Sequence, residues 1–147
     1  MRNILVAVDG SAYGEAAVRV AAELVRQHGA ASLTLLSVIE VVSSDTGPVE
    51  VPGSPADPEA WAIFARPREI LAEAGIQPRL LLREGDPANE IIEAAKSGGY
   101  DLIVVGHRGL SPIKAFLLGS VSDRVVAHAP CSVLVVRPGL EAKARAG

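Results

Sequence analysis

The chain has 147 residues, of which 49% are hydrophobic and 21% are charged, so it can build one full core and stay in solution. Its 14 lysine and arginine residues against 17 aspartate and glutamate residues give a net charge of −3, which argues against a nucleic-acid partner. Aromatic residues make up only 3%, too few for base-stacking platforms, and the single cysteine excludes an intrachain disulfide.

The N-terminal part of the chain predicts a strand, a helix and a second strand. Residues 4–8 form a short apolar run, typical of a strand buried on both faces, and residues 9–11 follow it as a turn. Apolar residues then recur at helical spacing over residues 11–28, with Ser11 as the expected N-cap and Gly29 as the residue that ends the helix. Residues 33–39 predict the second buried strand.

The middle of the chain predicts a long surface loop and an interrupted helix. Residues 40–58 contain four prolines and two glycines, a composition from which we expect no regular structure. Residues 59–75 have a helical pattern, but Pro67 is expected to break or kink the helix near Arg66. Trp61 and Phe64 are expected in the core.

The C-terminal half alternates strands with helices. Asp86 and Pro87 have the order of an N-cap and a first-turn proline, which predicts a helix that begins there. The pattern also predicts strands over residues 79–83, 102–105 and 132–136, and a helix over residues 120–128. Residues 139–147 are expected to form a frayed tail behind a single domain of residues 1–138.

Strands that alternate with helices predict a parallel sheet with right-handed crossovers. We therefore expect a Rossmann-like, doubly wound α/β fold, with five parallel strands in the order 3-2-1-4-5 and helices on both faces. The first and fourth strands are expected at the centre, where the winding reverses and such sheets bind ligands. Asp9 follows the first strand and Gly106 the fourth, so both are expected at the same ligand-binding mouth.

A glycine-rich segment follows the fourth strand. It reads Gly106-His107-Arg108-Gly109, then nine residues, then Gly119-Ser120-Val121-Ser122 at the start of a helix. Glycines permit tight turns and let a ligand approach the backbone, and the first N–H groups of a helix attract anions. The combination, with its serine hydroxyls, favours a phosphate-bearing ligand. In the alternative interpretation, Ser120 only caps the helix and the glycines only turn the chain.

This segment resembles the nucleotide-binding subclass of the universal stress protein family, which carries G-x2-G-x9-G-[S/T]; Gly106, Gly109, Gly119 and Ser120 fit that spacing. The resemblance extends to residues 4–11, 35–38, 85–87 and 128–131. Ser37 departs from the pattern, because a histidine is common at that position in the family. The resemblance covers nearly the whole chain except residues 41–58.

The resemblance implies an adenine nucleotide alpha hydrolase-like fold and ATP binding by a homodimeric, cytoplasmic stress-response protein. It implies that Ala7 and Val38 flank adenine, that residues 106–109 follow the ribose and phosphates, and that residues 119–122 cradle the phosphates. The implied nucleotide-binding residues are Ala7, Asp9, Val38, Gly106, His107, Arg108, Gly109, Gly119, Ser120, Val121 and Ser122.

Asp9 has two interpretations. Near a polyphosphate, a bare carboxylate is repelled, so the resemblance implies that Asp9 helps to hold Mg²⁺ between the two. In the alternative, Asp9 is a turn residue that bonds the backbone of the first helix.

Three functions stay open. A nucleotide-dependent regulator is favoured because the glycine motif is intact, whereas a slow ATP hydrolase or phosphotransferase lacks a well-placed base in the sequence. His107 and Arg108 are the strongly functional side chains of the glycine turn, although loop residues of this kind often face solvent. The third class is a dimeric scaffold without turnover. The sequence has neither a Walker motif nor a G-x-G-x-x-G fingerprint after the first strand.

Partners and location follow from the last strand and the composition. Residues 132–136 are expected at a sheet edge, and pairing with the same strand of a second copy would cover this apolar edge. The resemblance implies the same homodimer. The single cysteine fits the reducing cytoplasm, and the apolar runs are shorter than the ~20 residues of a membrane helix, so no membrane partner is expected.

Overall fold

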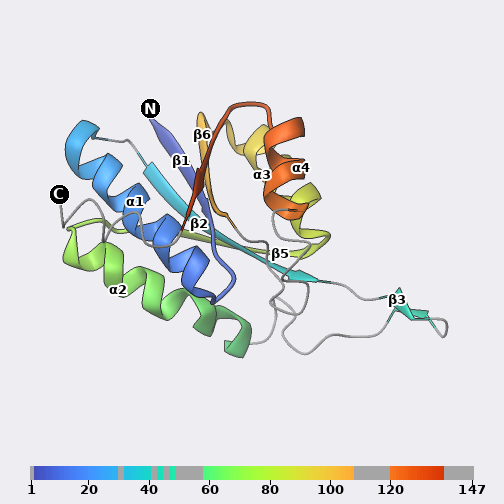
Figure 1. The fold of residues 1–147 in the computed structure, drawn as a ribbon. Coiled ribbons are helices and arrows are strands. Elements are labelled where there is room, and N and C mark those ends of the chain that lie inside the picture. The colour runs from blue at the N-terminus through green and yellow to red at the C-terminus, as the bar shows by residue number, and fades with distance from the viewer. Residues whose placement is uncertain are drawn as a thin grey trace.

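The chain folds into a five-stranded parallel sheet with helices on both faces (Figure 1). This computed structural model describes residues 2–29, 32–40, 43–44, 47–48, 58–107 and 120–137. The strand order is β5-β2-β1-β6-β7, which confirms the predicted doubly wound order 3-2-1-4-5.

The central strand β1 (Asn3–Ala7) pairs in parallel with β2 (Ser32–Glu40) on one side and β6 (Leu102–Gly106) on the other. The two edges are β5 (Arg79–Gly85), which pairs with β2, and β7 (Ser132–Val136), which pairs with β6. Four consecutive residues of β1 are buried, as expected for a strand covered on both faces.

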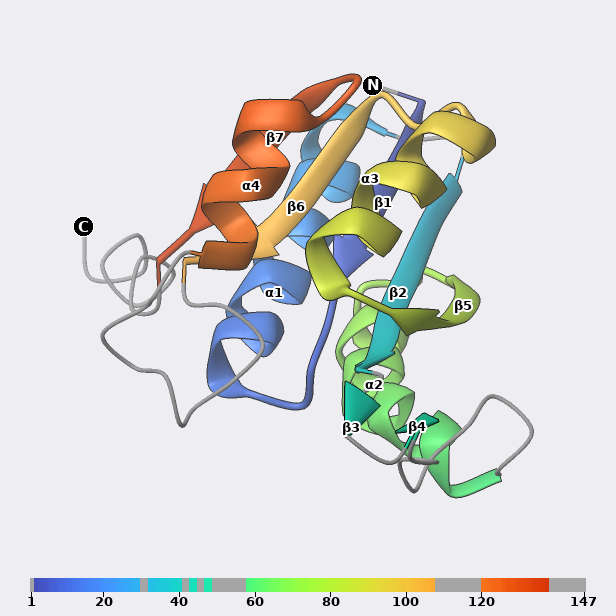
Figure 2. The same ribbon diagram turned by 90° about the vertical axis from the view of Figure 1, so that its right-hand side faces the viewer.

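The helices divide between the two faces of the sheet. Helices α1 (Ala12–His28) and α2 (Ala65–Glu73) cover one face, and α3 (Pro87–Gly98) and α4 (Ser120–His128) cover the other (Figure 2). Because successive side chains of a strand point to opposite faces of the sheet, the core is divided into two apolar clusters, one on each face. Ile4 and Val6 belong to the cluster under α1 and α2, and Leu5 to the cluster under α3 and α4.

Local signals fix the helix ends where the sequence predicts them. Ser11 caps α1, because its Oγ accepts a hydrogen bond of 3.3 Å from the N–H of Gly14. Gly29 follows α1 with a φ of 74°, and its N–H donates to the carbonyl of Val25. Asp86 caps α3 in the same way as Ser11 caps α1, by accepting from the N–H of Asn89 at 3.0 Å.

Two expectations about the middle of the chain are wrong in part. The segment of residues 40–58 contains a two-residue antiparallel ladder between β3 (Ser43–Ser44) and β4 (Gly47–Pro48), where we expected no regular structure. Proline is tolerated there because a strand edge leaves its missing N–H without consequence. Pro67 does not break α2, since it is the third residue of the helix, where an N–H has no intrahelical partner.

The change of helix type comes before Pro67. The 3₁₀ helix η1 (Pro58–Phe64) runs directly into α2, so the interruption falls at Phe64. Phe64 is buried, with 1% of its surface exposed, but Trp61 is 38% exposed and lies outside the core we expected it to join. The centroids of the Trp61 and Phe64 rings are 5.8 Å apart.

Candidate functional site

The predicted site residues that the structure describes gather at the carboxyl edge of the sheet. Ala7 ends β1, Gly106 ends β6, and α4 begins at Ser120. The chain leaves β1 toward α1 on one face, and α4 lies on the other face (Figure 2). The winding therefore reverses between β1 and β6, as predicted, and this is where doubly wound sheets bind ligands.

Three residues of the predicted motif, Arg108, Gly109 and Gly119, lie outside the described residues. Their assignment to a ligand stays a prediction from the spacing of the sequence.

Asp9 lies in the turn between β1 and α1 and is half-buried. Its Oδ1 accepts two hydrogen bonds from Ser11, one from the N–H at 2.9 Å and one from the hydroxyl. Asp9 therefore bonds the N-cap residue of α1, as expected of a turn residue, and its role toward a cation stays a prediction. Among the described residues, its Oδ2 accepts no hydrogen bond, so one carboxylate oxygen is left for another partner.

Gly106 is required by the packing of α1 on β6. A Cβ on Gly106 would lie 2.8 Å from the carbonyl oxygen of Tyr13 and 2.9 Å from its Cβ, closer than real contacts allow. Gly106 also belongs to β6, where it is in register with Val136, and not to a turn after the strand. We expected this glycine in a turn beside a ligand, and no local pattern in the sequence indicates its contact with α1.

The peptide groups of His107 are held by two other elements. Its N–H donates to the carbonyl of Val136 at 2.6 Å, and its carbonyl accepts from the hydroxyl of Ser122 at 3.3 Å. The N–H of His107 is therefore engaged in the sheet and is not free to bind phosphate. Its half-buried side chain remains at the carboxyl edge.

The start of α4 presents its first turn at this edge. Ser120 is exposed, Val121 is half-buried, and Ser122 is only 4% exposed. The hydroxyl of Ser122 anchors α4 to the end of β6 through His107, whereas Ser120 is accessible to a ligand. The N–H groups of this first turn have no acceptor within the helix, which makes the turn attractive to an anion.

Ala7 and Val38 lie on the same face of the sheet as α4. Ala7 is in register with Leu36, so Val38 lies two residues further along the neighbouring strand and points to the same side. Both pack against the cluster under α3 and α4. Val38 is half-buried, whereas Ala7 is buried, with 6% of its surface exposed.

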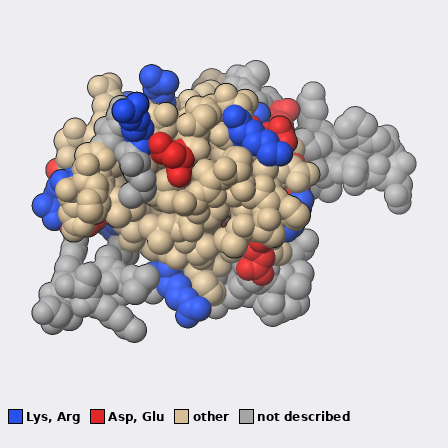
Figure 3. Space-filling model, turned by 90° about the horizontal axis from the view of Figure 1, so that it is seen from above, with Lys and Arg blue, Asp and Glu red and all other residues tan. Residues whose placement is uncertain are grey.

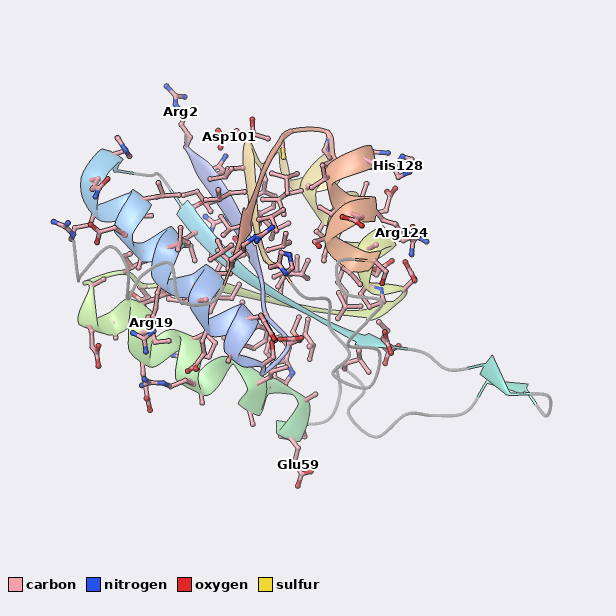
Figure 4. The ribbon with its side chains drawn as sticks, viewed as in Figure 1. Arg2, Arg19, Glu59, Asp101, Arg124 and His128 are labelled. Carbon is pink, nitrogen blue, oxygen red and sulfur yellow. The ribbon has the colours of Figure 1, made fainter. Side chains whose placement is uncertain are left out.

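An ion pair joins α3 to α4. Arg124 Nη1 lies 3.0 Å from Asp86 Oδ2, and its Nη2 donates to Asn89 Oδ1 at 2.8 Å. The hydrogen bond from the N–H of Asn89 is the main cause that lowers the pKa of Asp86, and the nearby Arg124 lowers it further. In Figure 4, Arg124 projects from α4, while Arg2 and Asp101 lie together at the opposite, amino-terminal edge. We expected Asp86 only to cap α3, and no local pattern in the sequence indicates its partner Arg124 on α4.

Charge and metal-binding groups are sparse on the described surface. Figure 3 shows the basic and acidic side chains of one face dispersed among other residues. Among the described residues, no three His, Cys, Asp or Glu side chains gather to hold a metal ion. Nor does any helix in this part of the chain have the length and apolar character to cross a membrane.

Together, the sheet order and the helices on both faces define a doubly wound α/β protein whose winding reverses between β1 and β6. Residues 1–137 match the universal stress protein family, and the chain belongs to that family. The universal stress protein YxiE of Bacillus subtilis is 39% identical over 146 residues, which cover 92% of this chain and 98% of the relative.

Solved structures agree with this assignment. The universal stress protein UspA from Lactobacillus plantarum aligns with a TM-score of 0.73 and 29% identity, covering 92% of this chain and 97% of its own. A universal stress protein solved in complex with cAMP aligns with a TM-score of 0.71 and 26% identity, covering 92% of this chain and 96% of its own.

Proposed function

We propose that this chain binds ATP at the carboxyl edge between β1 and β6 and acts as a nucleotide-dependent regulator in a stress response. The observation that supports this most is the convergence of the start of α4, the Asp9 carboxylate and the ends of β1 and β6 at one edge. The G-x2-G-x9-G-S spacing of the sequence, of which Gly106 and Ser120 lie at this edge, adds a phosphate-binding signature.

In this proposal, adenine lies between Ala7 and Val38, and the phosphates meet the N–H groups of residues 120–122. Because the hydroxyl of Ser122 donates to His107, the accessible hydroxyl of this turn is that of Ser120. The motif spacing assigns Arg108, Gly109 and Gly119 to the ribose and phosphates.

Mg²⁺ fits this arrangement through Asp9. A hard cation prefers carboxylate oxygens, and Asp9 Oδ2 accepts no hydrogen bond from the described residues. The cation would neutralise the phosphate charge that otherwise repels this carboxylate. The chain itself supplies one oxygen ligand, and the phosphates supply others.

We favour regulation over hydrolysis because, apart from Arg108, the groups proposed to hold the phosphates are main-chain N–H groups and a hydroxyl. Such groups bind charge without moving protons, whereas phosphoryl transfer needs a positioned nucleophile and charge stabilisation in the transition state. Any hydrolysis should therefore be slow.

cAMP is a second candidate ligand because a relative has been solved in complex with it. It carries one phosphate and has no triphosphate tail for a cation to neutralise. Calorimetric titration with ATP, AMP and cAMP, each with Mg²⁺ or with EDTA, separates the two ligands. Tighter binding of ATP only when Mg²⁺ is present supports our proposal, and cation-independent binding of cAMP alone supports the second candidate.

The test of the function begins with purified protein. Nucleotide released by denaturation is identified, and ADP formation is followed after ATP and Mg²⁺ are added. Bound ATP with negligible ADP supports the regulator, steady ADP formation supports a hydrolase, and absence of any binding contradicts the proposal. Gly119→Val should abolish ATP binding because a side chain would occupy the phosphate space. Ala127→Val, which adds the same bulk to an exposed position of α4, is the control.

A homodimer through β7 is part of the proposal. The edge strand β5 carries Arg79, Arg83 and Glu84, charges that discourage pairing, whereas β7 has no charged residue and keeps Val133, Leu134 and Val135 half-exposed. Pairing of β7 with its copy about a two-fold axis would cover this edge. Light scattering should give twice the monomer mass, and Leu134→Lys should reduce it. Since the single cysteine fits a reducing compartment, we propose the cytoplasm as its location.

A further inference from the structure

Asp9 is held in one orientation by two residues of the turn and the first helix. The hydroxyl of Ser11 donates to Asp9 Oδ1 while it accepts from the N–H of Gly14 at 3.3 Å. The N–H of Ser11 donates to the same carboxylate oxygen at 2.9 Å. Ser11 therefore connects the first turn of α1 to a single oxygen of the carboxylate.

Gly14 leaves the space that this carboxylate occupies. It is buried, and a Cβ built on it would lie 3.2 Å from Asp9 Oδ1 and 3.4 Å from the backbone nitrogen of Asp9. Contacts this short force a neighbour to move. A glycine within a helix makes the helix less stable than an alanine would. The glycine at position 14 therefore lowers the stability of α1 and leaves room for the Asp9 carboxylate.

We infer that Ser11 and Gly14 are positioning residues that fix Asp9 Oδ1 and thereby present Oδ2 to the Mg²⁺ of a bound nucleotide. The inference rests on the proposed function and adds to it the two residues that set the orientation of the cation ligand. A carboxylate that turns freely would lose conformational freedom when it binds the cation, and this arrangement removes that cost beforehand.

The competing interpretation gives both residues structural roles only. Ser11 is the N-cap of α1, and a small residue at position 14 also eases the packing of α1 against Val8. A purely structural role changes stability and predicts no specific effect on the cation. A positioning role predicts that both substitutions weaken the contribution of Mg²⁺ to ATP binding, and that they do so only while the Asp9 carboxylate is present.

The experiment measures ATP affinity by calorimetry with Mg²⁺ and with EDTA, and takes the ratio of the two affinities. The variants are Ser11→Gly and Gly14→Ala, with Asp9→Asn as the reference for loss of the carboxylate. Glycine at an N-cap lowers helix stability only slightly, so Ser11→Gly removes the hydroxyl without unfolding α1. Ser11→Thr keeps a hydroxyl that donates and accepts. Ser97→Ala is a matched control, because it removes a hydroxyl that donates to Glu93 within α3.

We expect Ser11→Gly to reduce the Mg²⁺ ratio by about fivefold or more, the effect of losing a hydrogen bond to a charged group. Gly14→Ala should also reduce it, because the added Cβ would lie 3.2 Å from Asp9 Oδ1 and displace the carboxylate. Ser11→Thr should restore the ratio, and Ser97→Ala should leave it at the wild-type value. Combined with Asp9→Asn, neither substitution should reduce the ratio further, because both act through that carboxylate.

The inference is overturned if Ser11→Gly has the same ratio of ATP affinities, with Mg²⁺ and with EDTA, as the wild type. It is also overturned if Ser11→Gly lowers this ratio by the same factor in the Asp9→Asn variant as in the wild type. ATP binding by the wild type without any Mg²⁺ dependence also overturns it, while the proposed nucleotide binding stands. Absence of ATP binding by the wild type refutes the proposed function and the inference together. If Gly14→Ala does not fold, Ser11→Gly and Ser11→Thr still decide the question.

Discussion

Gly106→Ala should destabilise the protein even when no nucleotide is bound. The new Cβ would lie 2.8 Å from the carbonyl oxygen of Tyr13, whereas an ordinary contact is about 3.4 Å. Helix α1 and strand β6 must therefore separate by about 0.6 Å at this point. Neither side moves easily, because Tyr13 is in the first turn of α1 and Gly106 is in register with Val136. Overpacking of this kind costs typically 1–3 kcal/mol, and contact with backbone atoms favours about 2–3 kcal/mol.

Urea unfolding followed by circular dichroism measures this effect. The midpoint should fall with an unchanged m-value, since the same surface is exposed on unfolding. Gly119→Val is the informative comparison, because we expect it to reduce ATP affinity and to leave the unfolding midpoint of the nucleotide-free protein close to the wild type. Wild-type stability in Gly106→Ala, together with lost ATP affinity, would refute the reasoning: it would mean that the ligand, and not α1, requires this glycine.

Four further substitutions test individual side chains. Ser122→Ala removes the hydroxyl that donates to His107 and should lower the free energy of unfolding by about 1 kcal/mol, whereas Ser120→Ala should lower ATP affinity with little effect in urea. Tyr100→Phe leaves the buried Thr34 hydroxyl without its donor at 2.7 Å and should cost about 1–2 kcal/mol; an unchanged unfolding midpoint would contradict this. The pKa of Asp86 is lowered from 3.8 by folding, so its stabilising contribution is present above pH ~4 and is lost as the pH falls toward the folded value. Asp86→Asn, which keeps an N-cap, should lack this contribution to acid stability in urea titrations.

The sheet order and the helix ends could be predicted from the sequence because local patterns carry them. Each of these signals is made by residues a few positions apart: the apolar run of β1, the N-cap Ser11 before α1, and Gly29 directly after α1. The point at which the winding reverses then follows from the parallel topology, since the carboxyl ends of β1 and β6 meet at one edge.

Other features depend on contacts between distant parts of the chain. The need for glycine at position 106 comes from Tyr13, and the partner of Asp86 is Arg124 on another helix. Neither pairing leaves a local pattern in the sequence. The exposure of Trp61 has the same origin, because the burial of a helical residue depends on what the tertiary fold packs against it.

The backbone of His107 connects the end of β7 to the start of α4. Its N–H is bonded to the last residue of β7 and its carbonyl to the first turn of α4, and these two groups belong to consecutive peptide planes that meet at the Cα of His107. The start of α4 and the end of β7 are therefore connected through one residue at the carboxyl edge of the sheet. A tilt of α4 would act first on the backbone of His107 and, through it, on the hydrogen bond to β7.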